Sequence, residues 1–89
     1  GQVCVAGSRL LVEAPVHDAF VTELAAATQK MTVGNPLRLE TQVGAVNSLT
    51  QLEGNLGFVA DATREGGEIV SGGGRALTET GGYYMDPTI

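Results

Sequence analysis

The sequence predicts an α/β layer architecture in which elements follow one another in the order strand, helix, helix, strand, strand. Two observations support this fold class. Apolar residues recur at helical spacing over residues 15–32 and again over residues 48–66. Short segments with apolar and β-branched residues, bounded by Gly, Pro or small residues, predict strands over residues 9–13, 68–71 and 83–89.

A short strand and a helix that begins at Pro15 are predicted in the first third of the chain. The stretch RLLVE, residues 9–13, lies between AGS and AP and predicts a short strand. Pro15 suits the first turn of a helix, where its missing N–H costs nothing. The helix predicted over residues 15–32 carries one apolar stripe, and Gly34 is expected to end it. The stripe consists of Val16, Phe20, Leu24, Ala27 and Met31.

The second half of the chain begins with a connection over residues 33–47 that has no clear period. Ser48 and Gln51 have the spacing of a capping box and predict the start of a helix over residues 48–66. Gly66 and Gly67 are expected to end that helix. The strands predicted over residues 68–71 and 83–89 then flank the turn-rich stretch GGGRALTETGG, in which we interpret GGGR, residues 72–75, as a flexible turn.

Composition narrows the classes of function. Ten acidic and five scattered basic residues give a net charge of −5, which argues against a nucleic-acid partner. No apolar run approaches the roughly 20 residues of a membrane helix, so no membrane partner is expected. One Cys and one His do not suffice for a usual metal site. A single cysteine fits a reducing compartment, and we expect a cytoplasmic protein.

The chain has few residues suited to the core of an independently folded domain. It has 13 glycines, no tryptophan and only 4% aromatic residues, so large core side chains are scarce. It begins with Gly1, not with an initiator methionine. We therefore expect a piece of a larger protein.

Cys4 has two interpretations. A free cysteine between Val3 and Val5 is often a buried small hydrophobe. Alternatively, the small residues after Cys4 allow a tight turn in which backbone N–H groups favour a nucleophilic thiolate. His17 is the only histidine, and it lies beside Asp18 and off the apolar stripe, so we expect a solvated surface side chain. Residue types alone leave the role of Cys4 open.

Longer motifs add a resemblance. The opening GQVCVAGSR has every fixed position of the pattern Gly-Gln-x-Cys-x-Ala-Gly-Ser-Arg, the catalytic-cysteine motif of the NAD(P)-dependent aldehyde dehydrogenase superfamily. VGNPL at residues 33–37, QVGAVNS at 42–48, and GYYMDPTI at 82–89 resemble family segments in the same order. The resemblance covers essentially the whole chain.

This resemblance implies an enzyme that oxidises an aldehyde to a carboxylic acid with NAD or NADP, through a cysteine thiohemiacetal and a thioester. Cys4 would be the nucleophile in a loop over residues 1–8. Its neighbours Val3 and Val5 would line the substrate pocket, and Gln51 would contact the nicotinamide ribose, although helix capping also explains Gln51. The chain would be part of the catalytic domain, without the cofactor domain or the general-base glutamate, and we expect it to be inactive alone.

The resemblance also bears on partners. The sequence of the cysteine motif resembles that of dehydrogenases acting on aminoaldehydes, such as betaine aldehyde or γ-glutamyl-aminobutyraldehyde. Family members are usually homodimers or homotetramers, and the same is implied for the parent protein. The alternative from another class is a stand-alone small thiol redox or binding module, which would need a resolving thiol or a base beside Cys4.

Overall fold

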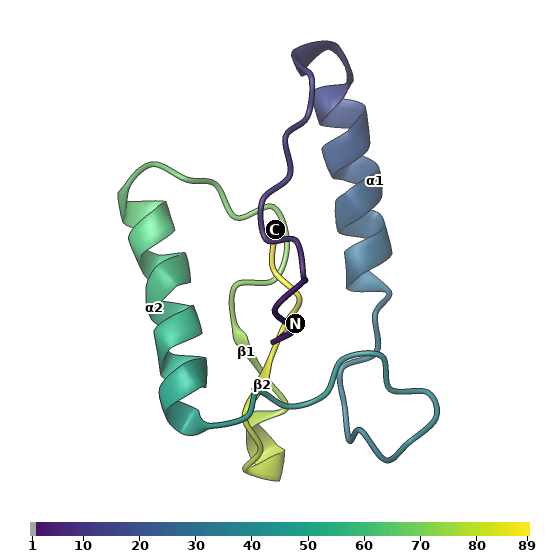
Figure 1. Ribbon diagram of the computed structural model, residues 1–89, viewed down its shortest axis with the longest axis vertical. Helices are drawn as coiled ribbons and strands as arrows, with labels where there is room; N and C mark the ends of the chain where they lie inside the picture. Colours follow the sequence, from purple (N-terminus) through teal and green to yellow (C-terminus); the bar gives the residue numbers. More distant parts are fainter. Residues whose placement is uncertain (1) are drawn as a thin grey trace.

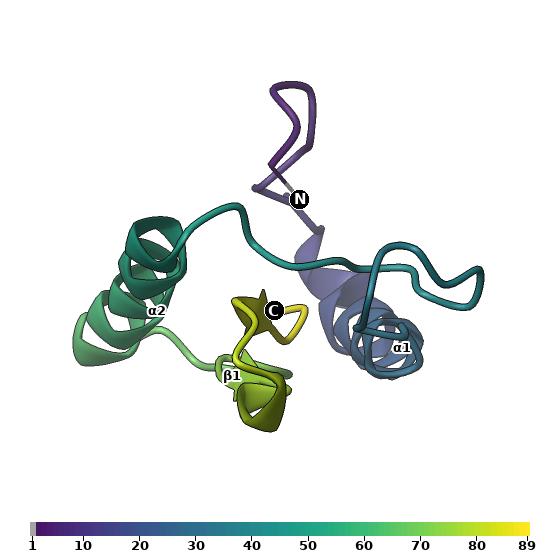
Figure 2. The ribbon, with the colours of Figure 1, turned by 90° about the horizontal axis from the view of Figure 1, so that it is seen from below.

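Residues 2–89 are described by a computed structural model. Gly1, the first residue of the predicted nucleophile loop, lies outside the described residues. Two helices, α1 (His17–Gln29) and α2 (Leu49–Arg64), stand on either side of the C-terminal part of the chain (Figure 1). Seen from below, the N-terminal segment stands apart from the layer that the helices and the C-terminal segment form (Figure 2). The predicted α/β class is observed as two helices beside a small antiparallel strand pair.

The first helix is shorter than the predicted span of residues 15–32. Pro15 lies in a single 3-10 turn, η1 (Ala14–Val16), and the α-helix begins only at His17. At the other end, Lys30 N–H donates to Ala27 O at 3.2 Å, a three-residue spacing that tightens and ends the last turn. The helix therefore ends before Gly34, which the sequence had suggested as its stop.

Helix α2 lies close to its predicted bounds of residues 48–66. Ser48 is the N-cap, and its hydroxyl oxygen accepts a hydrogen bond from the backbone N–H of Gln51 at 3.2 Å. At the C-terminus, Gly67 N–H donates to Ala62 O and Gly66 N–H to Thr63 O, while Gly66 has a φ of 96°. These are the bonds of a Schellman motif, whose left-handed residue favours glycine. The predicted stop at the two glycines is confirmed.

The connection over residues 33–47 folds into a closed loop. Val33 and Val43 form an isolated parallel bridge, and Gly34 N–H donates to Val43 O at 3.0 Å. Further along, Val46 N–H donates to Tyr83 O at 2.7 Å. The connection thus brings the start of α2 against the C-terminal segment.

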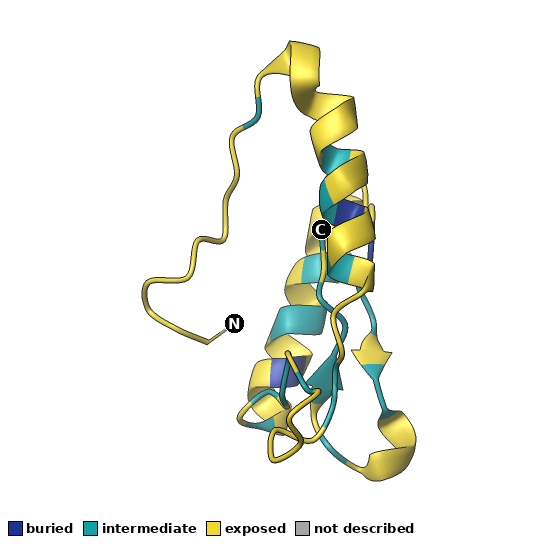
Figure 3. Ribbon diagram, turned by 90° about the vertical axis from the view of Figure 1, so that its right-hand side faces the viewer, coloured by how far each residue is buried: buried dark blue, intermediate teal, exposed yellow. Residues whose placement is uncertain are grey.

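The strand predicted over residues 9–13 is absent. The segment is extended, but among residues 2–89 it has no ladder partner. The β-propensity of residues 9–13 favours an extended backbone. A β-strand, however, also needs a neighbouring strand to share its backbone hydrogen bonds. In Figure 3 this N-terminal segment runs exposed beside α1 for most of its length.

The predicted strands over residues 68–71 and 83–89 form one irregular hairpin instead of two full strands. Only β1 (Arg75–Ala76) and β2 (Tyr84–Met85) have regular pairing, with Arg75 opposite Met85 and Ala76 opposite Tyr84. A 3-10 turn, η2 (Thr78–Thr80), lies at the tip. Arg75 belongs to the GGGR run that we had interpreted as a flexible turn, and Ala76 belongs to the turn-rich stretch that follows, so the sequence analysis missed β1.

The same antiparallel register continues beyond the strands and is interrupted in the middle. Asp86 N–H donates to Gly74 O, and Ile89 and Ser71 exchange hydrogen bonds near 3 Å. Between these pairs lies Pro87, which has no N–H and stands opposite Gly73 in this register, while the neighbouring Gly72 has a φ of 75°. An added Cβ at Gly72 would lie 2.2 Å from Pro87 O, so the two backbones approach too closely for a side chain. This break limits the regular strands to two residues each.

Buried apolar side chains are few. Leu52 of α2 is 1% exposed and Ala25 of α1 is 8% exposed, and these two form the buried apolar core of the described residues. Figure 3 shows the remaining helical surface as mostly exposed or half-buried. Within residues 2–89, neither helix has the length and apolarity that crossing a bilayer requires.

Candidate active site

Cys4 lies in a tight turn near the start of the described chain. Ala6 N–H donates to Val3 O at 2.9 Å, which places Cys4 and Val5 at the two central positions of a β-turn. Cys4 is a free, exposed cysteine. Its own backbone N–H has no acceptor among residues 2–89. The turn therefore presents a thiol and an unused hydrogen-bond donor on the same residue.

The exposure of Cys4 bears on its two interpretations. A small hydrophobic cysteine would be buried, whereas the thiol of Cys4 faces solvent in the described fold. Val3 and Val5 are 57% and 86% exposed, so they flank the sulfur as an open apolar surface. The turn does not bury any of the three side chains. Within residues 2–89, Cys4 is therefore not a buried core side chain.

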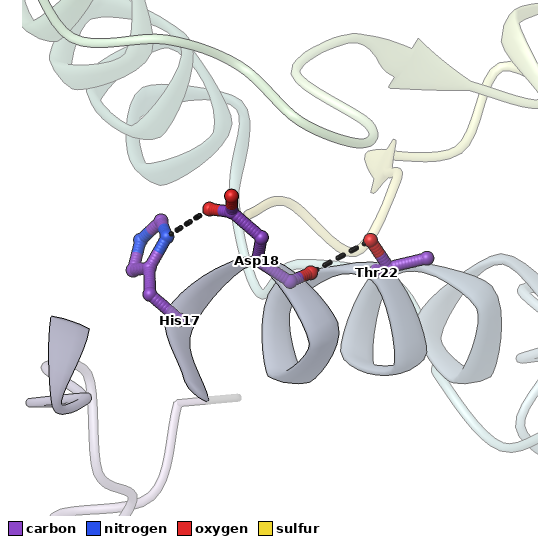
Figure 4. Close-up of polar contacts among 3 residues, drawn as sticks. All are labelled: His17, Asp18 and Thr22. Atoms are coloured by element: carbon purple, nitrogen blue, oxygen red, sulfur yellow. Dashed lines mark hydrogen bonds and ion pairs between the residues drawn. The ribbon is translucent and has the colours of Figure 1, made fainter. Parts of the chain in front are cut away.

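His17 does not pair with Cys4. Its Nδ1 lies 2.9 Å from Asp18 Oδ1 in the first turn of α1, and both side chains are exposed (Figure 4). Thr22 Oγ1 donates to the backbone oxygen of Asp18 one turn later. The structure agrees with the expectation of a surface histidine.

Gln51 occupies the first turn of α2. Its side-chain Nε2 donates to Asn55 Oδ1 at 2.9 Å, one turn along the same exposed face. The predicted capping box is therefore only half formed: the Ser48 hydroxyl caps Gln51 N–H, but the Gln51 side chain does not return to Ser48. Capping thus no longer explains the side chain of Gln51, and its Oε1 has no donor among the described residues.

A sequence model of the aldehyde dehydrogenase family matches residues 1–89. The chain belongs to the aldehyde dehydrogenase family. It is 38% identical over 92 residues to the betaine aldehyde dehydrogenase of Vibrio vulnificus. This match covers 100% of this chain and 19% of that protein. It is also 38% identical over 93 residues to the 4-trimethylaminobutyraldehyde dehydrogenase of Rattus norvegicus, again covering 100% of this chain and 19% of that protein.

The fold agrees with the sequence match. A variant of the betaine aldehyde dehydrogenase from Staphylococcus aureus, solved with NAD+ and with a cysteine modified by β-mercaptoethanol, superposes with a TM-score of 0.92. It shares 32% identity, and the match covers 98% of this chain and 18% of that one. The chain thus spans about a fifth of the length of its aldehyde dehydrogenase relatives. Family membership favours the dehydrogenase over the alternative of a stand-alone thiol module.

Two residues of the family-like motifs form a contact that sequence reasoning missed. Gln2, two positions before Cys4, forms two hydrogen bonds to Asn47, which directly precedes the N-cap of α2. The structure thereby brings the cysteine turn to the end of α2 that carries Gln51. No local pattern relates residues 45 positions apart. Their only sequence signal is that both lie in segments resembling the family.

The described residues suit one contact to a dinucleotide, although they do not form its whole site. The exposed amide of Gln51 has a free oxygen and one free N–H, which can bond to a ribose hydroxyl. The glycine-rich run of residues 72–74 lies in the hairpin and not between a strand and a helix, so it lacks the geometry of a phosphate-binding loop. Within residues 2–89, no three His, Cys, Asp or Glu side chains gather as a metal site would need.

Proposed function

We propose that the whole protein oxidises an aldehyde to a carboxylic acid with NAD or NADP, and that Cys4 is its nucleophile. The observation that carries this proposal is the exposed thiol of Cys4, held in a turn with an unused backbone N–H, within the cysteine motif of an aldehyde dehydrogenase family chain. The β-mercaptoethanol adduct on a cysteine of the Staphylococcus aureus relative supports a reactive thiol in this family.

The chemistry follows from the groups at the turn. The thiolate of Cys4 bonds to the carbonyl carbon, and the carbonyl electron pair moves to oxygen, where the Cys4 N–H donates a hydrogen bond. A hydride leaves the thiohemiacetal carbon and a thioester remains; NAD(P)+ supplies the hydride acceptor when bound. Water then adds to the thioester with loss of a proton, the C–S bond breaks, and the acid leaves as the thiolate is restored.

The flanking residues fit this role. Val3 and Val5 offer apolar surface on both sides of the sulfur, and we propose that they line the substrate pocket. Gln51 offers its free amide atoms to the nicotinamide ribose. The names of the relatives support an aminoaldehyde such as betaine aldehyde as the substrate class.

Further features of the whole protein remain predictions. We propose that residues 1–89 are a partial catalytic domain, with the cofactor domain elsewhere in the protein. The homodimer or homotetramer implied by the family resemblance stays a prediction. A cytoplasmic location would keep the free, exposed thiol of Cys4 reduced.

The test is the Cys4→Ser variant of the whole protein. Because an alcohol is a far weaker nucleophile than a thiolate, we expect aldehyde-dependent formation of NAD(P)H to fall by at least about 1,000-fold. Absorbance at 340 nm measures the rate, and mass spectrometry of the native protein detects the acyl adduct on the Cys4 peptide. Thr63→Ala, an exposed change at the far end of α2, serves as the control. An undiminished rate in Cys4→Ser would exclude this mechanism.

The 89-residue chain alone is expected to be inactive. The general base and the cofactor domain that the family resemblance implies are not provided by these residues. The purified chain should therefore produce no NADH from betaine aldehyde above the buffer rate. Turnover by the isolated chain that disappears in its Cys4→Ser variant would contradict this expectation.

A further inference from the structure

A pair of amide groups joins the turn of Cys4 to the start of α2. Gln2 Oε1 accepts a hydrogen bond from the backbone N–H of Asn47 at 3.0 Å, and Gln2 Nε2 donates to Asn47 Oδ1 at 3.0 Å. A backbone N–H can only donate, so the oxygen of Gln2 must face it and its nitrogen must face Asn47 Oδ1. Both bonds therefore need the amide of Gln2 in this one orientation. We call this contact the Gln2–Asn47 clasp.

The clasp is the sole polar link between the N-terminal segment and the rest of the described chain. Within residues 2–89, the other hydrogen bond of residues 2–12 is internal and joins Ala6 to Val3. The segment is mostly exposed and stands apart from the helices and the hairpin (Figure 2). Among the described residues, the two hydrogen bonds of the clasp are therefore the polar contacts that fix the position of the turn.

The backbone of Gln2 gives the clasp a second effect. Gln2 has a φ of 58°, in the left-handed region that residues other than glycine rarely occupy. Such a conformation persists only where surrounding contacts maintain it. Loss of the clasp lets Gln2 return to an ordinary φ, which redirects the chain two residues before Cys4.

The other end of the clasp lies where cofactor contact is proposed. Asn47 directly precedes Ser48, the N-cap of α2, and Gln51 lies in the first turn. The Ser48 hydroxyl holds the backbone N–H of Gln51, so Asn47 and Gln51 belong to one rigid helix start. The clasp therefore connects the nucleophile and the proposed ribose contact through a few short bonds.

We propose that Gln2 and Asn47 are positioning residues that fix the turn of Cys4 relative to the N-terminus of α2. The inference rests on the proposed function, because Cys4 is a nucleophile and Gln51 a cofactor contact only in that proposal. Neither Gln2 nor Asn47 needs to touch the substrate. Their role is to hold the sulfur where aldehyde and cofactor meet.

Three apolar variants of the whole protein test the clasp. Gln2→Met keeps the length of the side chain and removes both bonds, whereas Asn47→Leu removes only the bond to Oδ1. We expect kcat with betaine aldehyde to fall about 10- to 100-fold in Gln2→Met, as for a displacement of about 1 Å, and less in Asn47→Leu. The KM for NAD+ should stay within about threefold, because α2 itself is intact. The double variant should match Gln2→Met, since both changes act on one contact.

Gln42→Met is the matched control. Gln42 Oε1 also accepts one backbone N–H at 3.0 Å, from Thr32, but in the closed loop and away from the turn. The proposal is overturned if Gln2→Met loses no more kcat than Gln42→Met, or if the losses of Gln2→Met and Asn47→Leu multiply in the double variant. Melting temperatures of all four proteins identify any variant that is merely unfolded.

A second readout does not need turnover. The rate of Cys4 alkylation by iodoacetamide should fall about threefold or more in Gln2→Met, because a loose turn no longer presents the thiolate in one geometry. The double variant should show the same rate as Gln2→Met. The rate should stay unchanged in Gln42→Met. Unchanged alkylation in Gln2→Met would reject the clasp. If the native protein fails to oxidise aldehydes but alkylation still depends on Gln2, the proposed function fails and the structural role of the clasp stands.

Discussion

Single side chains on the surface of this chain set local geometry more than they set stability. In the closed loop, Arg38 Nε donates to Glu40 Oε1 at 2.8 Å, and both side chains are exposed. Exposed ion pairs of this kind contribute little to stability and weaken as salt is added. Their effect is expected in the pKa of the carboxyl group.

The pKa of Glu40 is expected to be lower than usual. The hydrogen bond from Arg38 is the main cause, with a smaller contribution from a backbone hydrogen bond, because both favour the charged carboxylate. Since the folded pKa is the lower one, the small stabilisation is present above the unfolded pKa and is lost as pH falls through the folded value. The pKa of Glu40 is measured from its carboxyl 13C chemical shift during an acid titration.

Arg38→Met should return the pKa of Glu40 toward its ordinary value of about 4.3. Arg64→Met provides the control, because Arg64 pairs with Asp61 in α2 and does not contact Glu40. Equal pKa values for Glu40 in the native chain and in Arg38→Met would contradict the assignment.

Glycine has different roles in α2 and in the hairpin. Gly54 and Gly57 lie inside α2, where an added Cβ would meet no atom within 4 Å. They lower the stability of the helix, and no close contact in the described fold requires glycine at these positions. Gly72 in the hairpin is different, because its positive φ and its approach to Pro87 leave no room for a Cβ. The same substitution should therefore have opposite effects in the two elements.

Gly54→Ala should stabilise α2 by about 0.5–1 kcal/mol, because alanine loses less backbone entropy and has no clash there. The mean residue ellipticity at 222 nm of the chain measures the gain in helix. Gly72→Ala should leave α2 unchanged but open the hairpin, seen as faster hydrogen exchange of the Ile89 and Asp86 amides, which donate across the break. A loss of helix in Gly54→Ala would contradict this expectation.

The fold as a whole exposes more surface than its mass requires. Its accessible area is 6710 Å², whereas a compact monomer of 9.1 kDa exposes about 4,900 Å². Its radius of gyration is 13.9 Å, against about 12 Å for a compact chain of this length. Leu10, Leu11 and Phe58 are among the large apolar side chains that lie open, at 59%, 89% and 76% exposure. Such surface is typical of an element set that packs against a larger body.

The isolated 89-residue chain should consequently unfold without a sharp transition. Leu52 and Ala25 are the only buried apolar side chains among residues 2–89, so little apolar burial opposes the chain entropy. We expect a broad thermal transition and strong binding of the dye ANS, as for loosely packed states. A single cooperative transition without ANS binding would show that the chain is an independent domain.

Local signals in the sequence sufficed for the helices and for the family. Apolar periodicity located α1 and α2, the Ser48 cap and the Gly66 stop located the ends of α2, and the motif around Cys4 indicated the family. These features depend on neighbours within a turn or two, so the sequence contains them directly. The strand over residues 9–13 could not be decided in this way, because extended propensity does not supply a partner.

Long-range geometry was decided only by the tertiary structure. The hairpin register, interrupted where the backbones of Gly72 and Pro87 approach each other, depends on which backbones meet. The clasp between Gln2 and Asn47 joins residues 45 positions apart, and the exposure of the Cys4 thiol follows from a turn that no other element of residues 2–89 covers. The physical reason is common to all three: hydrogen bonds and burial between distant segments depend on how the chain closes in space, which local preferences do not determine.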